Sequence, residues 1–201
     1  MRERRVLPGI PALMVALSVW GTAQAAAFTL PLPDGWRSET IPFPLPFAPG
    51  LPYEGVEELR FAPGMFTAGA DDFWTYAFCW WVPEDTPLDS KLLERDLEAY
   101  FAGLTRTVED AEHFTAEDPR YAVQLEPKRT RAGEPRAWSG SLDVFDAFVT
   151  HAPLALNVQV EVESCPDEGM VGVLFLVSPQ PAGHAVWKSL AQLRAGFRCR
   201  G

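Results

Sequence analysis

The sequence FWTYAFCWWV at residues 73–82 decides the fold. Successive side chains of a β-strand point to opposite faces, so this stretch divides into two alternating sets. The even-numbered set reads Trp, Tyr, Phe, Trp, Val and the odd-numbered set reads Phe, Thr, Ala, Cys, Trp. Both faces are largely apolar, which is typical of a strand that is covered on both sides. We therefore predict a central strand over residues 72–82 with a packed layer on each face.

A helix is predicted directly after this strand. Thr86 suits the N-cap position, Pro87 suits the first helical position, and Asp89 completes a box-like start. Apolar residues then recur at steps of four, three and four along one stripe, at Leu93, Leu97, Tyr100 and Leu104. This stripe is expected to pack on the sheet.

The rest of the chain is predicted to supply more strands and a closing helix. Strand patterns occupy residues 56–61, 121–125, 137–148, 154–163 and 170–177. The final helix has the same apolar spacing, with Val186, Leu190, Leu193 and Phe197. Because short links join the late strands, we expect antiparallel pairing. The predicted fold class is α+β: a twisted antiparallel β-sheet, with an amphipathic helix after the third strand and a C-terminal helix packed on it.

A proline stands at every second position of Ile41–Phe47. In an extended chain these prolines share one side, which then offers no N–H groups. We interpret the segment as a protected edge strand or extended arm. The alternative is a polyproline II ligand for an aromatic groove, although that helix repeats every three residues.

Residues 1–25 have the parts of a secretory signal peptide. Three arginines precede a short apolar run, and Ala23-Gln24-Ala25 resembles a cleavage site. The run is too short to span a bilayer, although an uncleaved anchor is the alternative. We expect a protein exported to the periplasm or secreted, with residues 26–201 forming a single α+β domain.

The composition is acidic, with 17 Lys and Arg against 27 Asp and Glu and a formal net charge of −10. The signal segment contains three of those basic residues and one of the acidic ones, so the remainder has a charge of −12. Nucleic-acid binders are normally basic, so we expect no nucleic-acid partner. No other segment is long and apolar enough to predict a membrane span in the mature chain.

Export makes cysteine pairing plausible. Cys165 ends a predicted strand and Cys199 ends the predicted last helix, and we predict a disulfide between them. Cys79 lies in the apolar central strand and is expected to be a buried thiol. The alternative is a reactive thiol, although bulky apolar neighbours raise the pKa of a thiol and do not lower it.

Two resemblances extend these inferences. FTLPLPDGW at residues 28–36, together with the closing helix, resembles the PsbP-like fold. GWRSETIPFPLPFAP, EELRFAPGMF and the segment from SPQP to FRC resemble a group of uncharacterised exported bacterial proteins. Neither resemblance supplies functional residues.

Catalytic motifs are missing from the sequence: there is no G-x-S-x-G, H-E-x-x-H, P-loop or C-x-x-C. No metal or other cofactor is predicted. Asp143 and Asp146, close to His151, are the candidates for acid–base or metal-assisted hydrolysis. The alternative is one solvated and one capping carboxylate, because residues three apart point to opposite faces of a strand.

Tryptophans are frequent, and aromatic platforms can hold a ligand. The candidates for ligand binding are Trp36, Trp81 and Trp138, with core packing as the alternative for each. The favoured hypothesis is an exported, non-enzymatic binding or accessory domain with an unknown protein partner or small ligand. The alternatives are a hydrolytic or metal-assisted enzyme and a structural subunit of an envelope assembly, which would expose a large apolar patch.

Overall fold

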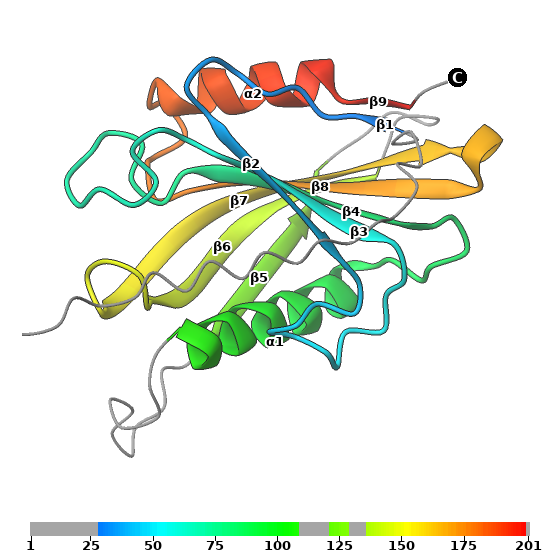
Figure 1. The fold of residues 1–201 in the computed structure, drawn as a ribbon, viewed down its shortest axis with the longest axis horizontal. Helices are drawn as coiled ribbons and strands as arrows, with labels where there is room; N and C mark the ends of the chain where they lie inside the picture. The colour runs from blue at the N-terminus through cyan, green and yellow to red at the C-terminus, as the bar shows by residue number, and fades with distance from the viewer. Residues whose placement is uncertain (1–27, 109–120, 129–135, 200–201) are drawn as a thin grey trace, which may run out of the picture.

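The computed structural model describes residues 28–108, 121–128 and 136–199. Figure 1 shows a twisted β-sheet with one helix on each side. In chain order the helices and strands are β1 (Phe28–Thr29), β2 (Arg37–Pro42), β3 (Val56–Phe61), β4 (Tyr76–Pro83), α1 (Ser90–Val108), β5 (Ala122–Pro127), β6 (Ala137–Asp146), β7 (Ala152–Cys165), η2 (Pro166–Glu168), β8 (Met170–Ser178), α2 (Val186–Gly196) and β9 (Arg198–Cys199).

Seven strands form the main sheet in the order β2-β3-β4-β8-β7-β6-β5, and every neighbouring pair is antiparallel. The predicted antiparallel sheet with helices packed on it is therefore confirmed. The central strands β4 and β8 pair over eight residues, with Phe78 opposite Phe175. All strands described from 121 to 178 follow the sequence predictions within a few residues.

Both faces of β4 are buried, as its sequence predicts. The even-numbered residues Tyr76, Phe78 and Trp80 join the core beneath α1, together with Leu93, Leu97 and Tyr100 of that helix. The odd-numbered residues Ala77, Cys79 and Trp81 join a second core with Leu190 and Leu193 of α2. Figure 1 shows α1 on one face of the sheet and α2, β1 and β9 on the other.

Two details of the predicted first helix are wrong. The helix follows the fourth strand, because the short N-terminal strands β1 and β2 are separate elements. It begins at Ser90, and the Asp89 carboxylate accepts a hydrogen bond from the Leu92 N–H at 2.9 Å. Asp89, rather than Thr86, therefore caps the helix, because a carboxylate oxygen at this position satisfies a free N–H of the first turn.

The proline-rich segment is an edge strand only at its start. β2 pairs with β3 through Pro42, and the Phe43 N–H then donates to the Gly55 carbonyl at 3.0 Å. The residues after Phe43 leave the sheet and turn onto α1, where Phe47 meets the Tyr100 ring at 5.0 Å between centroids. Gly103 of α1 lies against the Phe47 carbonyl, so any larger residue at 103 would collide with the backbone there. Packing on the helix therefore replaces the extended arm that the proline spacing predicts.

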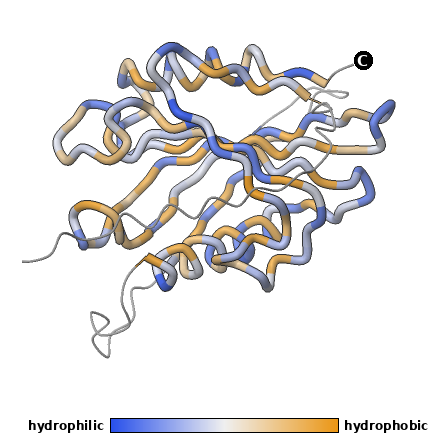
Figure 2. Tube along the Cα trace, in the orientation of Figure 1, coloured by the Kyte–Doolittle hydropathy of each residue, from blue (hydrophilic) through white to orange (hydrophobic). Residues whose placement is uncertain are grey.

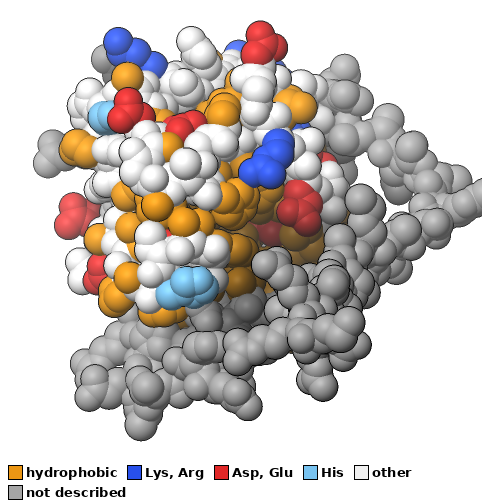
Figure 3. Space-filling model, turned by 60° about the vertical axis from the view of Figure 1, so that its left-hand side comes forward, with side chains coloured by type: hydrophobic (Ala, Val, Ile, Leu, Met, Phe, Trp, Pro, Cys, Tyr) orange, Lys and Arg blue, Asp and Glu red, His pale blue; other side chains and the backbone are white. Residues whose placement is uncertain are grey.

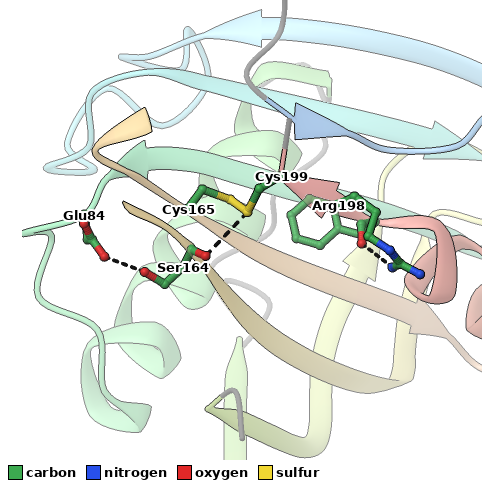
Figure 4. The surroundings of a disulfide bond; sticks show 6 residues. Glu84, Ser164, Cys165, Arg198 and Cys199 are labelled. Atoms are coloured by element: carbon green, nitrogen blue, oxygen red, sulfur yellow. Dashed lines mark hydrogen bonds between the residues drawn. A yellow bond between two sulfur atoms is a disulfide. The ribbon is translucent and has the colours of Figure 1, made fainter. Parts of the chain in front are cut away.

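The two ends of the described chain are joined. β1 pairs with β9, with Phe28 opposite Cys199. Cys199 forms a disulfide with Cys165 at the end of β7, as predicted (Figure 4). Nearby, the Ser164 hydroxyl donates to the Glu84 carboxylate.

Cys79 is a buried free thiol, and its burial raises its pKa well above the ordinary value.

The two outer edges of the sheet differ. β2 is mostly exposed and hydrophilic (Figure 2). At the other edge, two outward N–H groups of β5 are capped by α1: Val123 donates to Glu98 at 3.2 Å and Leu125 donates to Glu94 at 2.8 Å. Within the described ranges, no helix has the length and apolar character needed to cross a membrane.

Candidate functional site

An apolar pocket opens between the sheet, α1 and two loops. Its volume is about 210 Å³. The described residues that line it are Glu39, Ile41, Phe47, Leu59, Phe61, Met65, Phe66, Trp74, Tyr76, Tyr100, Leu104 and Phe148. In Figure 3, hydrophobic side chains gather around a hollow on this side of the molecule, with acidic and basic side chains at its border.

The loop between β3 and β4 forms one wall of the pocket. It is closed by the Ala62 N–H donating to the Thr75 carbonyl and by the Trp74 N–H donating to the Met65 carbonyl, each at 3.1 Å. Trp74 has a φ of 49°, which is rare for a bulky residue. This left-handed backbone ends the strand that the sequence predicts from residue 72, and it keeps the indole in the wall. Backbone strain of this kind is common at binding sites.

The turn after β6 packs against this loop and forms the adjoining part of the wall. Asp146 is fully buried, and its carboxylate accepts hydrogen bonds from the N–H groups of Phe148, Val149 and Thr150 at 2.8–3.1 Å. It also accepts from the Thr150 hydroxyl at 2.7 Å. Burial alone would raise the pKa of Asp146, but these hydrogen bonds outweigh it and lower the pKa. The turn places the Phe148 ring 5.6 Å from the Phe66 ring, measured between centroids. Both rings are part-exposed at the mouth of the pocket.

A buried carboxyl group lies beside the inner part of the pocket. Glu57 on β3 pairs in register with Ile41, which lines the pocket. Its Oε1 accepts a hydrogen bond from the Trp80 indole at 3.1 Å. Burial raises its pKa to about 8, although hydrogen bonding from Trp80 and Tyr100 acts in the opposite direction. The group is therefore mostly uncharged at neutral pH.

Three buried polar atoms near this region have no hydrogen-bond partner among the described residues. They are Glu57 Oε2, Trp74 Nε1 and the Tyr76 hydroxyl. Two of these residues, Trp74 and Tyr76, line the pocket. Buried polar groups are nearly always paired, so each of these atoms requires an explanation. Trp74 and Tyr100 lie close enough to the Asp146 and Glu57 carboxylates, respectively, to lower the pKa values of those groups.

The mouth of the pocket carries a cation over an aromatic ring. The Arg37 guanidinium carbon lies 5.3 Å from the centroid of the Phe66 ring. Arg37 and Glu39 are both exposed and lie on the same face of β2, which is the face toward α1.

The structure does not bring the two candidate catalytic carboxylates together. Asp143 is exposed, and its position three residues before Asp146 places it on the opposite face of β6. Asp146 uses both oxygens to hold the turn, and His151 is exposed beyond that turn. The arrangement matches the reading of one solvated and one capping carboxylate. Within the described part of the chain, no cluster of three or more His, Cys, Asp or Glu side chains could hold a metal ion.

The candidate ligand-binding tryptophans lie outside the pocket lining. Trp81 is buried beneath α2 and packs on Phe28 at 4.6 Å between ring centroids. Trp36 is part-buried against the same core, and Trp138 is buried in the core beneath α1.

Sequence reasoning missed the pocket because its lining comes from distant segments. Ile41 and Phe47 precede the central strand, Met65 and Phe66 lie in a loop, and Phe148 follows β6. The one available signal was the aromatic residue Phe66 outside the predicted strands, because Phe148 was expected at the end of a strand. Their meeting depends on the sheet order.

Comparisons with known proteins leave the family open. No protein-family model matches the chain, and no curated protein matches it. Among solved structures, it is similar to LpqN of Mycobacterium tuberculosis, which is described as involved in cell envelope biogenesis. The sequence identity is 15%, the match covers 84% of this chain and 78% of that chain, and the TM-score is 0.30. A TM-score this low supports no conclusion about fold or function.

Proposed function

We propose that this protein is an exported, non-enzymatic binding domain whose apolar pocket takes up a small hydrophobic ligand. The observation that carries the proposal is the pocket of about 210 Å³ between α1 and the sheet, with an almost wholly apolar lining. Ligand sites are typically concave and apolar with a few polar groups. An engineered apolar cavity of about 150 Å³ already holds benzene, so a one-ring ligand with a small substituent fits this volume.

Two further observations support the proposal. The Cys165–Cys199 disulfide favours an oxidising compartment outside the cytosol. Asp143 and Asp146 lie on opposite faces of β6, with Asp143 exposed and Asp146 buried, which favours binding over hydrolysis at these two carboxylates. The PsbP-like resemblance remains part of the proposal, supported at the level of an antiparallel sheet with helices packed on it.

The test is a titration with toluene followed by NMR chemical shifts. We expect shifts confined to residues that line the pocket, such as Ile41, Met65 and Leu104. Leu104→Trp fills the pocket from α1 and should abolish these shifts. Leu32→Trp is the matched control, because Leu32 is 53% exposed and does not line the pocket. Shifts spread over the whole surface, or unchanged in Leu104→Trp, would overturn the proposal.

A further inference from the structure

The pocket is unusually aromatic. Seven of its twelve described lining residues are aromatic, namely Phe47, Phe61, Phe66, Trp74, Tyr76, Tyr100 and Phe148. The face of an aromatic ring carries partial negative charge, so a set of rings around one cavity attracts a cation. A purely hydrophobic site would be served as well by Leu, Ile and Val.

The charge in the pocket lining favours a cationic ligand, as the aromatic rings do. Glu39 is the charged residue among the described lining residues. The whole chain has a formal charge of −10. An anionic ligand would be repelled by Glu39 and by the net negative charge of the chain, whereas a cationic ligand would be attracted.

The molecule itself contains an example of this attraction. The Arg37 guanidinium lies over the Phe66 ring at the mouth, 5.3 Å from the centroid. Phe66 is 38% exposed, so this cation–π contact is in a partly solvated place. A cation deeper in the pocket would lose more water and interact more strongly with the rings. Arg37 would repel it weakly across solvent.

We infer that the ligand is a small hydrophobic monocation, such as an ammonium group that carries one ring or a branched apolar substituent. This inference rests on the proposed function and specifies the ligand class of the same pocket. The aromatic faces recognise the charge, and the aliphatic residues Ile41, Leu59 and Leu104 contact the apolar part.

The test compares two molecules of the same shape. Benzyltrimethylammonium is cationic, and neopentylbenzene replaces its nitrogen with carbon and is uncharged. Both are titrated into the purified protein, and binding is measured by the change in tryptophan fluorescence. A cation–π gain of about 1–2 kcal/mol predicts that the cation binds about 5- to 30-fold more tightly.

Variants locate the effect. Glu39→Gln should reduce the preference for the cation several-fold, and Arg37→Gln should increase it. Glu126→Gln is the matched control, because Glu126 is exposed and does not line this pocket. Equal binding of the two molecules, or tighter binding of neopentylbenzene, would overturn the cation inference and leave the binding function standing. If neither molecule binds and toluene produces no chemical-shift changes in the pocket, both the cation inference and the proposed function are wrong.

Discussion

Glu57 accepts a hydrogen bond from the Trp80 indole at 3.1 Å within the core beneath α1, while its second carboxyl oxygen has no hydrogen-bond partner among the described residues. This carboxyl group is stable mainly in its protonated form, because burial disfavours the charged form more than the hydrogen bonds from Trp80 and Tyr100 favour it. Its pKa rises from 4.5 to about 8. The stability of the fold should therefore depend on the protonation of this one residue.

The first prediction concerns the pH dependence of stability. The folded state binds the Glu57 proton more tightly than the unfolded state, so the stabilisation is complete below pH 4.5 and is lost as the pH rises toward 8. The loss should approach about 1.4 kcal/mol per pH unit between these values. Urea unfolding at several pH values measures it.

Glu57→Gln removes the titrating group and should flatten this part of the stability curve. Glu126→Gln changes an exposed glutamate in the same way and should leave the slope unchanged. An unchanged slope in Glu57→Gln would show that another group causes the pH dependence.

The second prediction concerns the disulfide. Cys165 and Cys199 are 34 positions apart, and closing a loop of that length stabilises by about 4 kcal/mol in the chain-entropy model. Replacing both cysteines with serine should lower the free energy of unfolding by about that amount. Reductant should destabilise Cys79→Ala, which keeps the disulfide, but have no further effect on the double serine variant. Equal sensitivity of both variants to reductant would contradict the prediction.

The third prediction concerns the β5 edge. Glu94 and Glu98 of α1 cap the N–H groups of Leu125 and Val123. Replacing both glutamates with alanine should speed hydrogen exchange of these two amides several-fold, because a hydrogen bond of about 1 kcal/mol is lost at each. Amides of the central strands β4 and β8 should not change. Arg106→Ala, at an exposed position of the same helix, is the control, and a similar effect there would point to loss of helix stability instead.

The fourth prediction concerns the turn that carries Phe148. The Asp146 carboxylate accepts four hydrogen bonds in this turn, and those bonds are strongest when it is charged. Asp146→Asn keeps the size but removes the charge, and should destabilise the protein by about 1–3 kcal/mol. Asp143→Asn, at an exposed position on the same strand, should be nearly neutral in the same thermal unfolding measurement. Equal losses in the two variants would argue against the capping role.

The sequence by itself determined the layers of this protein. Residues 73–82 are apolar at both parities, and a strand with two apolar faces needs a partner on each side. Two helices provide those partners, and the spacing of their apolar residues predicted both. The first packs with Leu93, Leu97 and Tyr100, and the second packs with Val186, Leu190 and Leu193. Local periodicity carries this information, because the side-chain direction repeats with the secondary structure. The pairing of Cys165 with Cys199 followed from the placement of both residues at the ends of predicted elements.

Only the tertiary structure decided the pocket and the path of the proline segment. The sheet order places β2 at one edge, so its Ile41 reaches the same cavity as Phe148 from the turn after β6. Period-two spacing predicted an extended arm through Phe47, but contact between Phe47 and Tyr100 of α1 outweighed it. Such contacts join residues tens of positions apart, and no local pattern encodes them.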